Sequence, residues 1–185
     1  MNLLAFLAST RDLCLFRRGP EDMPYSPQLL VGLLVASALF ASLFDVQLRD
    51  ARVAVVLASV LGTLATLYVL YGLLRLRGKA ERFVQTALAL VATSFLFELI
   101  AMPLLLLVPL PAAGTQTLKP GDVSGAQMLA AFAVFAFAIW QVCISVSILR
   151  RGMDVPVAGG VLVLLLLACT NFIVAAVCSY LFGMA

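Results

Sequence analysis

The sequence predicts an all-α integral membrane protein: a polytopic bundle of five transmembrane helices, preceded by an N-terminal interfacial helix. Of its 185 residues, 64% are hydrophobic and only 11% are charged, whereas soluble domains contain about 25% charged residues. A soluble fold of this size could not bury so much apolar surface, so lipid must be the solvent for much of the chain. The apolar residues form five long stretches joined by polar links. Residues 1–185 are therefore expected to form a single transmembrane domain.

The first segment, residues 2–16, is expected to form a helix that lies on the membrane surface. At about 100° per residue, its small and polar residues share one side of the helix, and leucine and phenylalanine cover most of the rest. Such an amphipathic helix suits the membrane interface better than the bilayer core. It would place Arg17 and Arg18 among the lipid headgroups. The residues on the polar side are Asn2, Ala5, Ser9 and Asp12.

A proline-rich connector precedes the first predicted membrane span. Ser26 followed by Pro27 is typical of an N-cap and a first helical residue. The first span, from Gln28 to Phe44, reaches only about 25 Å at 1.5 Å per residue, so it should need local bilayer thinning to cross a core of about 30 Å. Small residues spaced four apart on the first two spans should allow close helix contact. The five spans are expected at about 28–44, 53–74, 83–107, 125–149 and 157–182.

The basic residues predict the orientation of the bundle. With the N-terminus in the cytoplasm, nine basic residues fall on the cytoplasmic side and three on the other side, as the positive-inside rule requires. Five spans then place the C-terminus in the periplasm, and the arginine-rich composition suggests a bacterial inner membrane. The residues expected to contact lipid headgroups are Arg17, Arg18, Arg75, Arg77, Arg150 and Arg151.

Glu98 is the single ionisable side chain well inside a predicted span, and a charge at that depth costs about 3 kcal/mol on insertion scales. It lies about 22 Å along its helix from Phe83, in the outer half of the bilayer. Asn171 falls at nearly the same depth on the last span, with Thr170 beside it. We expect Glu98, in its protonated form, to hydrogen bond with Asn171; the alternative partner is Arg49 or Arg52, which would keep Glu98 ionised.

Two interpretations of this polar cluster remain open. Glu98, Asn171, Thr170 and Gln141 are expected either to clasp the helices together or to form part of a proton or cation path. A path needs polar groups on both sides of Glu98, and the cytoplasmic half of its span offers few, such as Gln85 and Thr86.

Neither a metal site nor a cofactor site is expected, and we expect no enzymatic activity. The chain has no histidine, which removes a common metal ligand and a common general base. Serine residues therefore lack a histidine partner, and no nucleotide-binding or hydrolase motif occurs.

The layout of an N-terminal segment followed by five closely spaced spans resembles the Yip1 family. The segment RRGPEDMPYSP, from Arg17 to Pro27, is similar to the basic, proline-containing lead-in of bacterial Yip1-like proteins. Eukaryotic members carry a DLYGP motif before the first span, of which Gly19 and Pro20 remain here. The resemblance implies a non-enzymatic interaction role: eukaryotic members bind lipid-modified small GTPases and help to shape membranes, partners that a bacterial chain would not have.

The predicted function is therefore a non-catalytic scaffold, accessory or membrane-organising protein. The expected partners are the lipid bilayer and another membrane protein or a second copy of the chain, with no nucleic acid. The alternative is a small permease or proton-linked channel that uses Glu98.

Overall fold

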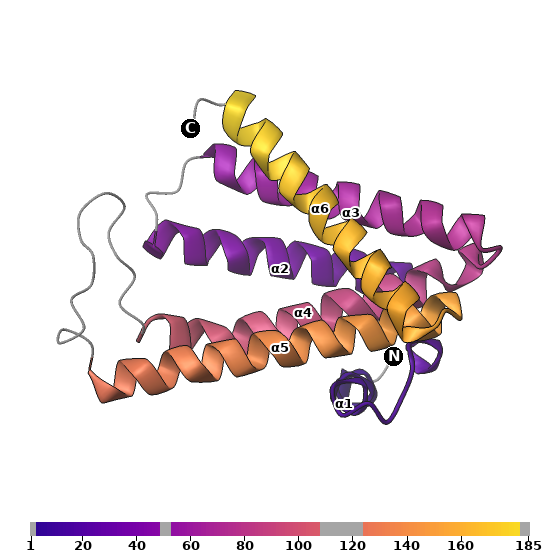
Figure 1. Ribbon diagram of the computed structural model, residues 1–185, viewed down its shortest axis with the longest axis horizontal. Helices are drawn as coiled ribbons and strands as arrows, with labels where there is room; N and C mark the ends of the chain where they lie inside the picture. The colour runs from indigo at the N-terminus through magenta and orange to yellow at the C-terminus, as the bar shows by residue number, and fades with distance from the viewer. Residues whose placement is uncertain (1–2, 49–52, 108–123, 182–185) are drawn as a thin grey trace.

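The computed structural model describes residues 3–48, 53–107 and 124–181, and these segments are helical with no strand. The all-α architecture predicted from the sequence is confirmed (Figure 1). Two short 3₁₀ helices, η1 (Pro20–Asp22) and η2 (Ala80–Arg82), lie in the connectors. The α-helices are α1 (Leu3–Cys14), α2 (Pro27–Leu48), α3 (Val53–Leu76), α4 (Phe83–Leu105), α5 (Gly125–Met153) and α6 (Val157–Leu181).

Four of these helices, α3 to α6, are long and apolar enough to cross a membrane. The apolar portion of α2, Pro27–Ser42, is shorter than these four candidate membrane spans. A polytopic membrane bundle is therefore supported, while the count of five spans stays a prediction. Residues 106–107, which the predicted third span included, lie beyond the end of α4, and residue 182 of the predicted fifth span lies outside the described residues.

Helix α2 is longer than the sequence suggested. It has 22 residues, about 33 Å at 1.5 Å per residue, but its apolar portion is only Pro27–Ser42, so local thinning of the bilayer stays a prediction. The helix passes the polar residues after Phe44 because no glycine or proline interrupts the chain between Gly32 and Leu48, and polar side chains alone do not end a helix. Its start was predicted correctly: the Ser26 hydroxyl accepts a hydrogen bond from the Leu29 amide at 3.3 Å, as an N-cap does.

The helices form two layers. Helix α4 packs between α2 and α5, whereas α3 packs along α6. Helix α6 begins beside the end of α5 and then crosses over α3 (Figure 1). At the start of α6, a Cβ on Gly160 would lie 3.0 Å from the carbonyl oxygen of Val146, so glycine is what allows α5 and α6 to approach so closely.

The two layers meet in a dense core at one end of the bundle. Its largest side chains are at most 1% exposed, and they come from the end of α3, the start of α4 and the end of α5. Because successive helices run in opposite directions, the arginine-rich segments surround this same end (Figure 1). We call it the basic end. The core side chains are Leu70, Leu74, Leu88, Ile148 and Leu149.

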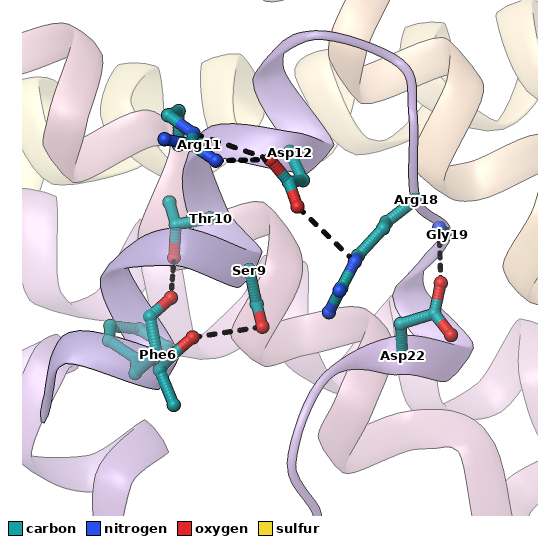
Figure 2. Close-up of polar contacts among 9 residues, drawn as sticks. Phe6, Ser9, Thr10, Arg11, Asp12, Arg18, Gly19 and Asp22 are labelled. Carbon is teal, nitrogen blue, oxygen red and sulfur yellow. Dashed lines mark hydrogen bonds and ion pairs between the residues drawn. The ribbon is translucent and has the colours of Figure 1, made fainter. Parts of the chain in front are cut away.

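Helix α1 packs against the side of the bundle towards the basic end, and its axis runs across the axes of the long helices, so that it is seen end-on in Figure 1. The placement of α1 at the membrane surface stays a prediction. The side that faces the bundle differs from the prediction: Ser9 and Thr10 are buried with Phe6 and Leu13, while Leu7 is 52% exposed. The two hydroxyls donate hydrogen bonds of 3.0 Å to main-chain carbonyls one turn earlier (Figure 2), so burying them leaves no unsatisfied donor.

Candidate functional site

A cavity of about 710 Å³ opens between α2 and α3, and it is the candidate site. It exists because α2 rests on α4 and α3 rests on α6, so that α2 and α3 have little contact with each other. Glu98 on α4 and Asn171 on α6 also contribute to its lining. The cavity therefore brings together the two residues that the sequence predicted to meet.

The predicted hydrogen bond between Glu98 and Asn171 does not appear among the described residues. One carboxylate oxygen of Glu98, Oε2, is buried and has no hydrogen-bond partner in this part of the chain. Asn171 instead lies against the backbone of α3, where a Cβ on Gly62 would come within 3.3 Å of its amide. The physical reason is the layering: α6 packs on α3 rather than on α4. Arg49 and Arg52, the alternative partners, lie outside the described residues.

The other two members of the predicted polar cluster are engaged elsewhere. Thr170 Oγ1 donates a hydrogen bond of 2.9 Å to the carbonyl of Leu166 on its own helix. Gln141 Nε2 donates to Ser94 Oγ at 3.0 Å and so links α5 to α4. Neither residue contributes to the lining of the cavity. Of the four predicted residues, Glu98 and Asn171 form part of the site.

Several hydroxyl groups of the cavity were not predicted as site residues. Ser37 and Ser42 on α2 and Thr63 on α3 contribute to its lining. The sequence signal was present, because Ser37 with Ala41 and Ser59 with Thr63 show the four-residue spacing of small residues. That spacing was interpreted as a close helix contact, whereas these faces border an open space.

The buried side chains between the cavity and the basic end are mostly apolar. The dense leucine and isoleucine core lies between them. Gln85, which was considered as an extension of a proton path, instead binds the lead-in segment: its Nε2 donates to the carbonyls of Met23 at 2.9 Å and Glu21 at 3.3 Å. Thr93 donates to the carbonyl of Ala89 at 2.9 Å.

The lead-in before α2 is ordered by contacts with the bundle and within itself. The Gly19 amide donates to Asp22 Oδ2 at 3.1 Å (Figure 2), and η1 packs against α4 and α5. Arg18 pairs with Asp12 at 3.3 Å. The segment from Arg17 to Pro27, whose sequence suggested the family, is therefore held in place at the basic end.

The six arginines predicted to contact lipid headgroups all lie at the basic end. Arg17, Arg18, Arg75, Arg77 and Arg150 are exposed, and Arg151 is half-buried. Two connectors at this end are held together by Asp154, which pairs with Lys79 and, at 3.4 Å, with Arg82. Their contact with lipid headgroups stays a prediction.

In the portion of the chain with defined positions, no group of three or more histidine, cysteine, aspartate or glutamate side chains could hold a metal ion. The four cysteines are free thiols. Burial raises the pKa of the Cys14 thiol above its ordinary value, which lowers its thiolate fraction at neutral pH.

The comparisons with known proteins agree with the layout. The family model of the Yip1 domain matches residues 16–179, from the lead-in segment almost to the end of α6. No curated protein and no solved structure matches the chain. Since the matched region covers most of the sequence, the chain belongs to the Yip1 domain family.

Proposed function

We propose that the protein is a non-catalytic scaffold or accessory protein of the bacterial inner membrane that organises lipids or a partner protein around its basic end. Membership of the Yip1 family and the long apolar helices support a multi-pass membrane protein. The observation that carries the organising role is a set of exposed arginines held over the most tightly packed part of the bundle.

The charge at the basic end is in excess of what its acids can neutralise. The segments around it carry nine basic residues and five acidic ones. Among the described side chains, the ion pairs at this end use the acids Asp12 and Asp154. The arginines that enter none of these pairs are Arg17, Arg75, Arg77, Arg150 and Arg151. Each basic residue near an anionic membrane surface contributes about 1 kcal/mol to binding.

The arginines stand on a rigid part of the bundle, so we expect them to bind particular anionic groups rather than to attract all anions equally. Gln85 and Asp154 fix two connectors to the helices, and the core beneath them has side chains that are at most 1% exposed. Arginines on a fixed frame lose less conformational entropy when they bind a phosphate or carboxylate group. The positive-inside rule places this end in the cytoplasm, with the end of α6 towards the periplasm.

Affinity purification from native membranes tests the proposal. The wild-type chain should co-purify with anionic lipid or a specific partner protein. A triple variant, Arg75→Gln with Arg77→Gln and Arg150→Gln, should lose at least about tenfold of that enrichment, since it removes about 1 kcal/mol of attraction per charge. The matched control is Arg11→Gln, because Arg11 already pairs with Asp12 at 3.0 Å. Equal enrichment in the wild type and the triple variant would contradict the proposed function.

A small permease or proton-linked channel is the second candidate. The observation that favours it is the buried Oε2 of Glu98 at the edge of a cavity of about 710 Å³. The packed core between this cavity and the basic end argues against a conducting path. Solute or proton flux into proteoliposomes distinguishes the transporter from the scaffold. A transporter loses flux in Glu98→Gln while remaining folded, whereas a scaffold shows no flux either as the wild type or as this variant.

A further inference from the structure

The two helix layers diverge away from the basic end, and the cavity occupies the space between them. Its apolar walls are open to the surroundings, because Val35 is 53% exposed, Leu39 62% and Leu64 55%. In a membrane these surroundings are lipid. The cavity volume of about 710 Å³ falls within the range of about 300–1,000 Å³ that is usual for ligand sites.

The lining of the cavity combines apolar side chains with a few polar groups at a similar depth. Val31 lies about 6 Å from the start of α2 at the basic end, whereas Ser42 lies about 22 Å from it at 1.5 Å per residue. Glu98 and Asn171 are each about 21–22 Å along their own helices from the same end. The carboxylate, the amide and the Ser42 hydroxyl thus lie at a similar distance from the basic end, and valine and leucine side chains line the cavity along its length.

Apart from the Asn171 amide, which carries two N–H donors, four polar side chains of the cavity offer it hydrogen-bond acceptors. The hydroxyl groups of Ser37 and Ser42 donate to carbonyls of α2, at 3.0 Å and 2.7 Å, and Thr63 donates to the Ser59 carbonyl at 2.9 Å. These three hydroxyls therefore present lone pairs to the cavity. Glu98 Oε2 has no partner among the described residues. A buried acceptor without a donor is costly, so an occupant that supplies N–H groups and positive charge complements the site.

We infer that the cavity binds one phospholipid with a primary-ammonium headgroup, whose ammonium donates to Glu98 while an acyl chain covers the apolar wall. A primary ammonium carries three N–H donors and the charge opposite to a carboxylate. A quaternary ammonium has the charge but no N–H, and a small free amine would leave the valine and leucine wall uncovered. The site lies at the opposite end of the bundle from the exposed arginines, so it does not depend on the proposed role of the basic end.

Native mass spectrometry of the full-length protein tests this inference. The probe is an equimolar mixture of phosphatidylethanolamine and phosphatidylcholine with identical acyl chains in detergent micelles. The wild type should retain the ethanolamine lipid about tenfold over the choline lipid, the effect of one charged hydrogen bond. Glu98→Gln should bring the ratio close to one. The matched control is Thr170→Val, which removes a hydroxyl beside Asn171 that bonds only to its own helix and should leave the preference unchanged.

A second variant keeps the inference falsifiable if Glu98→Gln does not fold. Ala38 lines the cavity one helical turn before Ser42, so Ala38→Leu should reduce the total lipid retained while Glu98 stays intact. Equal retention of the two lipids by the wild type overturns the inference, as does a preference that persists in Glu98→Gln. Displacement of the lipid by free ethanolamine at equal concentration, or a wild-type dimer that holds no lipid, also overturns it, since each shows a different occupant.

Discussion

The indole nitrogen of Trp140 donates a hydrogen bond of 3.0 Å to the main-chain carbonyl of Cys14. This bond fixes the last turn of α1 to the middle of α5. It satisfies a carbonyl that the end of a helix leaves without an intrahelical partner. A tryptophan that would otherwise serve only as packing or as an interface anchor therefore joins two segments far apart in the sequence.

Replacing Trp140 with phenylalanine should loosen α1 without disturbing the membrane helices. The variant removes one hydrogen bond, which contributes about 1 kcal/mol, or about a fivefold shift towards the detached helix. Limited proteolysis of the segment around Arg17 should become faster by that factor. Phe135→Leu on the same helix is the control, because Phe135 is 65% exposed and in no hydrogen bond. Unchanged proteolysis of Trp140→Phe would show that the bond does not hold α1.

The thiol of Cys14 should react with alkylating reagents only at a higher pH than an ordinary cysteine. Burial raises its pKa, and the thiolate is the reactive form. The sign for stability follows from proton linkage: a group whose pKa is raised by folding stabilises the fold below its ordinary pKa, and this contribution is lost as the pH rises through the raised value.

The measurement is the pH profile of alkylation in a chain whose other cysteines, Cys143, Cys169 and Cys178, are replaced by serine. The same chain unfolded in denaturant gives the reference profile. Coincident profiles would contradict the prediction. In the Trp140→Phe background the native profile should move towards the reference, because a detached α1 exposes the thiol.

The residue at position 154 combines a charge with an unusual backbone conformation. Asp154 ends α5 with φ +48° and pairs with Lys79 and Arg82. Asp154→Asn keeps a residue that tolerates the left-handed region and removes only the charge, so it should cost less than about 1 kcal/mol because the pair is exposed. Asp154→Ala should cost about 1–2 kcal/mol more. Thermal unfolding in detergent measures both, and equal losses would show that the backbone strain is relieved elsewhere.

Helix α5 approaches α4 closely at Gly152. A Cβ there would lie 2.7 Å from Thr86 Oγ1, so Gly152→Ala should cost about 1–3 kcal/mol through overpacking. Thr86→Ala in the same chain should recover most of that loss by making room for the new methyl group. Thr86 Oγ1 is itself buried with no hydrogen-bond partner in the described segments, so Thr86→Val alone should be neutral or stabilising. A double variant no more stable than Gly152→Ala alone would show that the two positions are not in contact.

Glu98 shows which features of the site could be predicted from the sequence and which could not. Its identity as the carboxylate within an apolar helix, and its depth level with Asn171, followed from spacing along two parallel helices. The direct bond between them did not follow, because equal depth does not make two helices neighbours. Helix α1 gives the same lesson: its helical period was correct, but Ser9 and Thr10 turned out to face the bundle, since their hydroxyls bond to the helix itself and need no water.

By itself, the sequence determined the helices, the lipid environment and the gathering of arginines at one end, because these depend on the length and hydrophobicity of each segment. The tertiary structure alone decided that α6 rests on α3, that α2 and α3 stand apart around a cavity, and that Trp140 reaches Cys14. The physical reason is that an apolar side chain in a membrane gains little by choosing a neighbouring helix over lipid. Hydrophobicity therefore does not specify which helices pack against each other. Close contacts at Gly62, Gly152 and Gly160 set that arrangement of the helices.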